Sequence, residues 1–492
     1  MEFSDRIKQV LESEPDKLAI EFNNEWLKWG ELHAYVKVLN ALLEQRGVRA
    51  GEAVAMVARN RAAHAAALIG SVAFRRSIAM IYGLQSSSAI ASNISNLRPS
   101  VLLADESDWT EDLVRVAAEA GTLGIALPPP LERMPYVVPG LETIGADVSR
   151  SPVAEPQIGM LTSGTTGAPK RLGLKMAVLA RTVESVTLSG GQQTGSPTDF
   201  VALPMASIGG VLQLFSAVYQ SHPVCLMEKF VVNDWVEAIK RHQPVALAVV
   251  PAMIRGVLEA DVPSSYLQSV KVVFGGSAPL EPEIQDRFEA TYGIPILWGY
   301  GATEFAGTAA SWTPALKREF SGAKRGSVGR ALPGITLRVV DPQTGQELGV
   351  GERGYVEAKI PILGDEWIHT TDIASLDADG FVFLHGRGDG AINRGGFKVL
   401  PETIVTALRQ HPHVRDAAAF GIPDARLGEV PVAAVELKKN AEAVSPDTLA
   451  LFLRQTLPSH SIPVRIEIME ELPRTPSLKV SIAQLKELIA SQ

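Results

Sequence analysis

The sequence predicts an α/β protein: a large N-terminal domain of α/β layers with a β-rich subdomain, followed by a small mobile α+β domain. Three observations support this prediction. Strand-like apolar runs alternate with helices of about ten residues, a pattern typical of parallel α/β layers. From about residue 325 the pattern changes to short alternating strands with turn signals. The glycine-rich stretch 386–390, which suits a hinge, precedes a shorter mixed segment. We expect domains at 1–388, including the subdomain at about 325–388, and at 389–492.

Hydrophobic periodicity predicts the individual elements. Apolar residues at helical spacing indicate helices, and short apolar runs indicate buried strands. Helices are predicted at 29–45, 61–74, 234–241, 252–258 and 281–292. Strands are predicted at 52–57, 101–104, 158–161, 201–203, 245–250, 270–274 and 295–297. In the β-rich subdomain, strands are predicted at 336–340, 354–358 and 381–384, with turns at 341–345 and 377–380.

Composition excludes several classes of protein. The 492 residues contain 46 Lys and Arg against 54 Asp and Glu, and the net charge of −8 disfavours a basic nucleic-acid-binding surface. The single cysteine, Cys225, excludes an internal disulfide, and its apolar neighbours favour a core residue over a nucleophile. The N-terminus lacks the apolar run of a signal peptide, and apolar runs elsewhere fall short of the ~20 residues that span a bilayer. We expect a cytoplasmic protein that binds no nucleic acid and has no membrane span.

The strongest local motif follows the strand predicted at 158–161. It reads Thr162-Ser163-Gly164-Thr165-Thr166-Gly167-Ala168-Pro169-Lys170. Glycines allow close approach of the backbone to a ligand, while hydroxyls, amides and the lysine suit phosphate oxygens. Composition alone fits a solvated turn equally well. The motif is not a Walker-type P-loop, because Thr165 stands where that motif requires lysine.

Seven further segments follow this loop in a recognisable order. They are Phe274-Gly275-Gly276-Ser277-Ala278-Pro279, Gly299-Tyr300-Gly301-Ala302-Thr303-Glu304, Thr370-Thr371-Asp372, Gly386-Arg387, Arg394-Gly395-Gly396-Phe397-Lys398, 421–429, and Pro473-Arg474-Thr475-Pro476-Ser477-Leu478-Lys479. Together with the loop they resemble the motifs of the adenylate-forming superfamily. That superfamily includes acyl-CoA and aryl-CoA ligases, adenylation domains of nonribosomal peptide synthetases, and luciferase. The resemblance covers nearly the whole chain and is closest to the acyl-CoA ligases.

The resemblance implies a role for each matching residue. ATP phosphates would bind Thr162, Ser163, Gly164, Thr165, Thr166, Gly167 and Lys170. Adenine and ribose would contact Ser277, Ala278, Pro279, Tyr300, Asp372 and Arg387. The catalytic residues would be Lys479, Thr303 and Glu304, with Glu304 also holding Mg²⁺ as a hard oxygen ligand. The hinge would be Asp389, and the CoA tunnel would include Arg394, Gly395 and Gly396. The acyl pocket would draw on Ser207, Gly209, Phe274, Gly275, Trp298 and Ala302.

The sequence departs from the superfamily pattern at several positions. Leu478 replaces the glycine that usually precedes the lysine, which predicts a more constrained approach of Lys479. Gly390 replaces the usual second aspartate, and Asn393 a common lysine. Ala206 and Ser207 stand where an aromatic–histidine pair is usual. These departures affect the expected substrate more than the expected chemistry.

The resemblance implies an ATP-dependent acid:CoA ligase that works through an acyl-adenylate, with ATP, Mg²⁺ and CoA as cofactors or co-substrates. A thiol of an acyl carrier protein is an alternative acceptor, and a nucleotide-binding descendant without activity is an alternative of another class. An oxygenase of the luciferase kind has no support in the sequence. Ser207, Gly209, Gly275 and Ala302 would leave room in the acyl pocket, and we expect a medium-chain or aromatic acid larger than acetate. The protein would be a monomer or homodimer.

Overall fold

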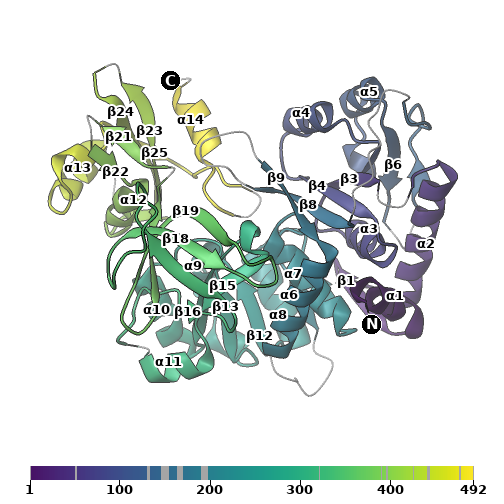
Figure 1. Ribbon diagram of the computed structural model, residues 1–492, viewed down its shortest axis with the longest axis horizontal. Coiled ribbons are helices and arrows are strands. Elements are labelled where there is room, and N and C mark those ends of the chain that lie inside the picture. Colours follow the sequence, from purple (N-terminus) through teal and green to yellow (C-terminus); the bar gives the residue numbers. More distant parts are fainter. Residues whose placement is uncertain are drawn as a thin grey trace.

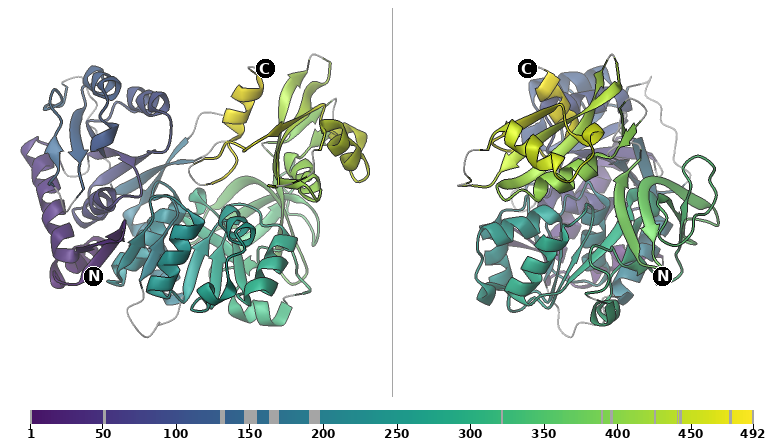
Figure 2. Two further views of the ribbon diagram at one scale, coloured as in Figure 1. Left: turned by 180° about the vertical axis from the view of Figure 1, so that it is seen from behind. Right: turned by 90° about the vertical axis from the view of Figure 1, so that its left-hand side faces the viewer.

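The computed structural model describes residues 2–49, 52–129, 133–145, 155–162, 170–189, 198–320, 322–388, 390–394, 397–424, 426–439, 441, 444–475 and 478–490. It confirms the predicted α/β class. Figure 1 shows the N-terminal elements (purple and blue) at one end, teal layers in the middle, and the yellow-green C-terminal elements at the other end. Figure 2 shows the same arrangement from behind and from the side, with the C-terminal elements lying over the middle of the molecule.

The N-terminal sheet has seven strands in the order β7-β6-β5-β3-β4-β8-β9. Its strands are β3 (Ala53–Ala58), β4 (Ser77–Tyr82), β5 (Val101–Asp105), β6 (Leu123–Leu127), β7 (Tyr136–Val137), β8 (Gln157–Thr162) and β9 (Lys170–Lys175). The strands between the two edges are parallel, and β7 and β9 are antiparallel to their neighbours. The helices of this part are α1 (Phe3–Ser13), α2 (Trp29–Gln45), α3 (Ala62–Ala73), α4 (Ser87–Leu97) and α5 (Glu111–Glu119).

Two sheets form the middle of the molecule. One has the order β10-β11-β1-β2, with β1 (Leu18–Phe22), β2 (Glu25–Lys28), β10 (Asp199–Val201) and β11 (Val224–Leu226). The other has the order β12-β13-β14-β15-β16, with β12 (Ala246–Val249), β13 (Val272–Gly275), β14 (Ile296–Ala302), β15 (Gly307–Ser311) and β16 (Arg330–Ala331). Their helices are α6 (Met176–Ser189), α7 (Ile208–Tyr219), α8 (Val232–His242), α9 (Pro251–Glu259), α10 (Pro282–Tyr292) and α11 (Pro314–Phe320).

The β-rich subdomain is an antiparallel sheet in the order β17-β18-β19-β20. It comprises β17 (Thr336–Val340), β18 (Gly354–Lys359), β19 (Trp367–Leu376) and β20 (Val382–Arg387). Buried side chains from this sheet, including Val339, Val356 and Val382, belong to the same hydrophobic cluster as residues of α8, α9 and α10. The subdomain therefore shares a core with the middle layers.

The C-terminal part is built on a long antiparallel hairpin, β23 (Val414–Asp424) and β24 (Gly428–Leu437). It also contains β21 (Ile392–Arg394), β22 (Phe397–Val399), β25 (Arg465–Met469), α12 (Pro401–Arg409), α13 (Pro446–Arg454) and α14 (Ile482–Ala490). Short 3-10 turns in the chain are η1 (Glu106–Asp108), η2 (Ser264–Leu267), η3 (Thr303–Phe305) and η4 (Ser459–Ser461). The two hydrophobic clusters of this part contain residues from Ile392 onward. The boundary at 388/389 remains a prediction, and the hinge residue Asp389 lies outside the described residues.

The predicted elements agree with the structure except at some boundaries. The helix predicted at 29–45 is α2, and the strand predicted at 336–340 is β17. The strand predicted at 201–203 lies earlier, as β10 (Asp199–Val201). The strand predicted to end at 297 continues to Ala302, because β14 leaves its parallel partner β13 and pairs antiparallel with β15. This extension carries the motif that contains Tyr300.

Candidate active site

The predicted phosphate loop joins two paired strands. Thr162 ends β8, Lys170 begins β9, and the two residues are partners in the antiparallel register. The first and last residues of the motif therefore lie opposite each other at the ends of two paired strands. Ser163, Gly164, Thr165, Thr166 and Gly167 lie outside the described residues, as do the side chains of Thr162 and Lys170.

The predicted adenine segment follows the end of β13. Ser277 has a positive φ of 68°, and this backbone geometry turns the chain away from the strand. Ser277, Ala278 and Pro279 line one cavity of about 390 Å³, which lies between the middle layers and the C-terminal part. Arg387 and Lys479 line the same cavity. The structure therefore brings together five predicted site residues from three separate motifs.

Tyr300, Asp372 and Arg387 form a connected polar group, and Arg387 lines this cavity. Tyr300 donates from its hydroxyl to Oδ2 of Asp372 at 2.6 Å. Asp372 and Arg387 are register partners on β19 and β20, and Oδ1 of Asp372 lies 3.7 Å from Nε of Arg387. Burial raises the pKa of Tyr300, and the negative charge of Asp372 raises it further. The phenol thus stays neutral and acts as a donor, which fixes the orientation of the Asp372 carboxylate.

Tyr300 is more enclosed than its predicted stacking role suggests. The residue is 6% exposed, and its ring packs edge-on against Phe305 at a centroid distance of 5.7 Å. Its clearest contact in the described structure is the hydrogen bond to Asp372. Stacking of adenine on Tyr300 remains a prediction.

Lys479 reaches the cavity from a tight loop of the C-terminal part. The amide of Thr475 donates to the Lys479 carbonyl at 2.6 Å, and the Lys479 amide donates to Thr475 Oγ1 at 3.2 Å. Desolvation lowers the pKa of the Lys479 ammonium, the charge of Arg387 lowers it further, and Asp372 opposes both effects. The predicted constraint from Leu478 is visible, because this residue has a left-handed φ of 62°. The leucine nevertheless leaves Lys479 lining the same cavity as Arg387.

The predicted metal ligand follows directly after β14. Glu304 lies in the turn η3, and its side chain is exposed. An exposed carboxylate is an oxygen ligand of the kind that Mg²⁺ prefers, so the residue fits the predicted role. The side chain of Thr303 lies outside the described part of the chain.

The predicted acyl pocket is narrower than the sequence suggests. A Cβ built on Gly275 would lie 1.9 Å from Cζ3 of Trp298, so the indole fills the space that we expected this glycine to leave open. Trp298 is 3% exposed and donates from Nε1 to the Ala278 carbonyl at 3.2 Å. A Cβ on Gly209 would lie 2.9 Å from Cδ1 of Leu203. Neighbouring side chains therefore lie close to the α-carbons of both glycines, and the extent of the acyl pocket remains a prediction.

The other predicted acyl-pocket residues keep distinct positions. Ser207 caps α7, where its hydroxyl accepts from the Gly210 amide at 3.3 Å and donates to the Pro204 carbonyl at 2.7 Å. Phe274 is 41% exposed, which leaves an aromatic surface for a ligand. Ala302 ends β14 and is partly buried.

The predicted CoA-tunnel residues are only partly described. Gly395 and Gly396 lie outside the described residues. Arg394 donates from Nη1 to the carbonyls of His460 at 2.8 Å and Ile462 at 3.0 Å, so part of its guanidinium stabilises the C-terminal domain itself. Contact of Arg394 with CoA remains a prediction.

Sequence reasoning missed Glu402, which lines the cavity near Arg387. Its Oε2 atom is buried with no hydrogen-bond partner among the described residues, and it lies 2.6 Å from where a Cβ on Gly386 would be. Burial raises the pKa of Glu402. Its only sequence signal is an acidic residue in the first turn of α12, which is common at helix N-termini.

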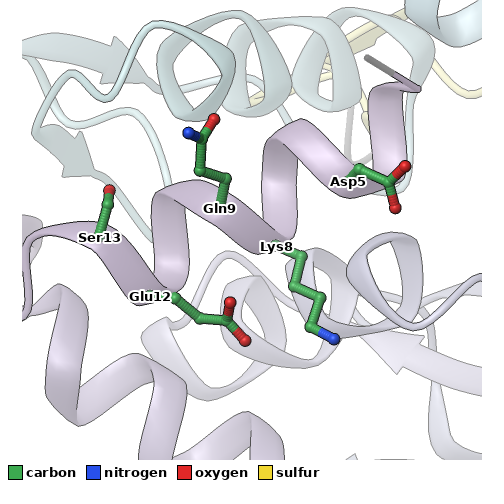
Figure 3. A pocket seen from close by; sticks show the side chains of 5 residues that line it. All are labelled: Asp5, Lys8, Gln9, Glu12 and Ser13. Atoms are coloured by element: carbon green, nitrogen blue, oxygen red, sulfur yellow. The ribbon is translucent and has the colours of Figure 1, made fainter.

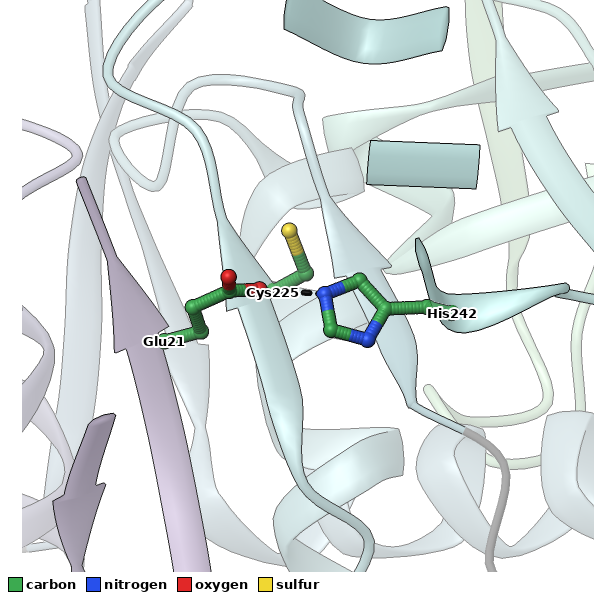
Figure 4. A group of neighbouring side chains, drawn as sticks. All are labelled: Glu21, Cys225 and His242. Carbon is green, nitrogen blue, oxygen red and sulfur yellow. Dashed lines mark hydrogen bonds and ion pairs between the residues drawn. The ribbon is translucent and has the colours of Figure 1, made fainter. Parts of the chain in front are cut away.

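Two features outside the cavity do not support another site. Glu21 of β1, Cys225 of β11 and His242 at the end of α8 lie together (Figure 4). The Glu21 carboxylate already accepts from His242 and from Arg241 Nη2, the latter at 3.0 Å. Burial raises the pKa of Cys225 to about 12. This thiol is therefore a poor nucleophile, as the sequence predicted.

A second hollow runs along the outer surface of α1. All five side chains that line it belong to this helix: Asp5, Lys8, Gln9, Glu12 and Ser13 (Figure 3). They are spaced along the helix and do not converge on one point, so we assign them no chemistry. In the described part of the chain no helix is long and apolar enough to cross a membrane.

Comparison with known proteins identifies the relatives of this chain. The family profile described as AMP-binding enzyme matches residues 7–363, and the profile of the AMP-binding enzyme C-terminal domain matches residues 404–479. A probable CoA ligase of Humulus lupulus is 27% identical over 354 residues, which is 68% of this chain and 63% of that protein. The indoleacetate–CoA ligase of Aromatoleum aromaticum is 28% identical over 512 residues, covering 100% of this chain and 98% of that protein.

Solved structures show the same fold. The o-succinylbenzoate CoA synthetase of Bacillus subtilis in complex with its acyl-adenylate superposes with a TM-score of 0.79 at 24% identity, covering 98% of each chain. ATP-bound MatB from Rhodopseudomonas palustris gives 0.80 at 23% identity, covering 99% of this chain and 98% of that one. The apo form of the same protein gives 0.66 at 24% identity, covering 99% and 98%. The overall arrangement therefore matches the ATP-bound form more closely.

Proposed function

This chain belongs to the AMP-binding enzyme family, and we propose that it is an ATP-dependent carboxylic acid:CoA ligase. It converts an acid, ATP and CoA into acyl-CoA, AMP and pyrophosphate through an acyl-adenylate. The observation that carries the proposal is the shared cavity. Lys479 of the C-terminal domain lines it together with Arg387 and the segment 277–279 of the N-terminal domain.

In the first half-reaction the substrate carboxylate attacks the α-phosphorus of ATP and pyrophosphate leaves. Negative charge accumulates around the α-phosphate, and a preformed cation in a partly dehydrated cavity stabilises it strongly. Lys479 supplies this cation and draws the carboxylate toward the phosphate. Asp372, held by Tyr300, accepts from the ribose hydroxyls, and Arg387 donates to ribose or phosphate oxygens. Glu304 would hold Mg²⁺, which when bound neutralises charge on the polyphosphate.

In the second half-reaction the CoA thiol attacks the acyl-adenylate and AMP leaves. We propose that the C-terminal domain rotates about Asp389 between the two steps, which removes Lys479 and brings the face with Arg394, Gly395 and Gly396 toward the adenylate. The same cavity then serves both half-reactions, and a different face of the C-terminal domain covers it in each. The relatives named above are CoA ligases, which supports CoA over a carrier-protein thiol as the acceptor.

We propose a medium-chain or aromatic acid as the substrate. The exposed ring of Phe274 offers an apolar aromatic contact, while Trp298 narrows the space beside Gly275. A flat aromatic acid or an unbranched chain fits a narrow apolar slot better than a branched acid does. The indoleacetate–CoA ligase that matches along the whole chain bears the name of an aromatic acid.

A panel of acids with ATP, Mg²⁺ and CoA, read by pyrophosphate release and thioester formation, tests the proposal. We expect thioester only when both an acid and CoA are present, and faster turnover of benzoate, phenylacetate or octanoate than of acetate. Acetate turnover equal to or above these acids would contradict the substrate class. Pyrophosphate release without thioester, restored by an acyl carrier protein, would contradict CoA as the acceptor.

A further inference from the structure

A chain of ion pairs crosses from the adenine segment to the C-terminal domain. Glu281 lies two residues after Pro279 and immediately before α10. Its carboxylate accepts from Arg255 of α9 at 2.6 and 2.8 Å, and from Arg409 of α12 at 2.5 Å. Arg255 and Glu281 belong to the middle layers, whereas Arg409 belongs to the C-terminal domain. The Glu281–Arg409 pair therefore joins the two domains directly.

Inside the C-terminal domain, Arg409 continues the chain to Asp416. Nε and Nη2 of Arg409 donate to Oδ1 of Asp416 at 2.9 and 2.6 Å, and Nη2 of Arg474 donates to Oδ2 at 2.8 Å. Asp416 is 2% exposed. Its burial by itself would raise the pKa of the carboxyl, but the charges of Arg409, Arg255 and Arg474 outweigh this effect and lower the pKa to about 2. The carboxylate is thus charged throughout the working pH range.

The last link is the loop that carries Lys479. Arg474 stands at the base of this loop, forms an isolated β-bridge with Val480, and donates from Nη1 to the Leu478 carbonyl at 3.4 Å. The guanidinium that pairs with Asp416 therefore also holds the backbone next to Lys479. An unbroken series of charged contacts runs from Glu281 to this backbone.

A second pair supports the same orientation. Arg415 of β23 donates from Nε to Glu259 of α9 at 2.9 Å and also pairs with Glu436. Glu436 in turn accepts from Arg474 at 3.4 Å. These two ion pairs between the domains, Glu259–Arg415 and Glu281–Arg409, both lead to the charged group that contains Arg474 and braces the Lys479 loop.

We propose that the Glu281–Arg409 pair positions Lys479 for adenylation, and that it stabilises this orientation of the C-terminal domain and no other. The inference rests on the proposed function, because it assigns the pair to one half-reaction. A contact between domains contributes free energy only in the orientation that forms it. When the C-terminal domain rotates for thioester formation, α12 moves with it and the pair separates. Loss of the pair therefore shifts the population away from the adenylating orientation.

Glu281→Gln is the sharpest variant, because it removes the negative charge from the contact between domains and leaves Arg409 paired with Asp416. We expect acyl-adenylate formation, measured as pyrophosphate release without CoA, to slow about tenfold, as a shift in population predicts. Thioester formation from pre-made acyl-adenylate and CoA should stay within about twofold of wild type, because that orientation does not use the pair. Equal slowing of both steps, or of neither, would overturn the proposal.

Glu289→Gln is the matched control. Glu289 lies on α10, the helix that follows Glu281, and pairs with Lys317 at 2.7 Å, but both residues belong to the middle layers. This variant should leave the ratio of the two half-reactions unchanged.

Hydrogen exchange on the protein without substrates separates this proposal from the proposed function. The Thr475 and Lys479 amides are hydrogen-bonded within the loop, so their exchange rates report how firmly the loop is held. Loss of the pair in Glu281→Gln should speed exchange of both amides, whereas Glu289→Gln should not change it. If the wild type adenylates no acid, the proposed function is contradicted, and hydrogen exchange alone then tests whether the pair positions the Lys479 loop. Unchanged exchange at both amides would then overturn the positioning role.

Discussion

The indole of Trp298 lies over the α-carbon of Gly275, the residue opposite it on the neighbouring parallel strand. A β-carbon at this glycine would meet three atoms of the ring within 2.8 Å. The ring is held from its other end by the hydrogen bond from Nε1 to the Ala278 carbonyl at 3.2 Å. One tryptophan thus contacts both Gly275 of the predicted acyl pocket and Ala278 of the predicted adenine segment, and we expect its size to limit the depth of the acid site.

Replacing Trp298 with Ala should broaden the acid specificity. Removing the indole opens the space beside Gly275, and each additional methylene buried there contributes about 0.8 kcal/mol. We expect the ratio of kcat/KM for octanoate to that for acetate to rise about tenfold or more.

Trp312→Ala is the control for this substitution. Trp312 is similarly buried, at 5% exposed, and donates from Nε1 to the Ser327 carbonyl at 2.8 Å. Its loss should lower stability without changing the ratio of the two acids. If Trp298→Ala also leaves the ratio of kcat/KM for the two acids unchanged, Trp298 does not line the acid pocket.

Replacing Lys479 with Ala should separate the two half-reactions. The variant loses the cation that we propose for the α-phosphate, so acyl-adenylate formation should slow about a hundredfold, equivalent to about 3 kcal/mol. Conversion of pre-made acyl-adenylate and CoA to thioester should keep a near-normal rate, because the proposed domain rotation displaces Lys479 in that step. Stopped-time assays of each half-reaction measure the difference.

Lys486→Ala provides the comparison, since Lys486 lines the same cavity and packs over the ring of Phe420. We expect it to leave both half-reactions unchanged. Normal adenylation by Lys479→Ala would show that our catalytic assignment is wrong.

Local sequence patterns predicted the parts of this molecule that depend on local forces. The apolar spacing in 29–45 predicted α2 at its observed bounds. The extension of β14 through Gly299 and Gly301 was missed, because glycine weakens strand propensity and the pairing partner β15 could not be known. The motif match predicted that Lys479 belongs with Arg387, but not the contacts that place it there. Arg474 pairs with Asp416 across 58 positions of the chain, and no local pattern marks such a pair.

Asp416 should make stability fall at acidic pH. A carboxyl whose pKa is lowered by folding adds stability above its unfolded value, about 3.9. That stability is lost as the pH falls through the folded value of about 2. The difference corresponds to about 2 kcal/mol. We expect Asp416→Asn to be less stable than wild type at neutral pH and to lose about 2 kcal/mol less free energy of unfolding between about pH 5 and pH 2.

Urea unfolding at several pH values measures this contribution. Asp379→Asn removes a carboxylate that pairs with Lys324 at the surface, and it should retain the wild-type pH dependence. Identical pH dependence in Asp416→Asn and wild type would show that the three arginines do not stabilise the charged carboxylate.

Leu478 combines backbone strain with an apolar contact between domains. Its φ of 62° places a branched side chain in the left-handed region, at a cost of about 1–2 kcal/mol. The side chain packs against the hydrophobic cluster of the middle layers, although the residue belongs to the C-terminal domain. We infer that this contact offsets the strain and helps to hold Lys479 toward Arg387.

Two substitutions separate these effects. Leu478→Gly removes both the strain and the contact, whereas Leu478→Ala removes most of the contact and keeps the strain. If the contact holds the lysine loop, both variants should slow acyl-adenylate formation several-fold. Because the alanine variant keeps the backbone strain, its free energy of unfolding should be about 1 kcal/mol lower than that of the glycine variant. If strain alone matters, Leu478→Gly should adenylate as fast as wild type or faster. Adenylation rates and urea unfolding of the two variants therefore decide whether Leu478 only strains the backbone or also holds the Lys479 loop through its packing contact.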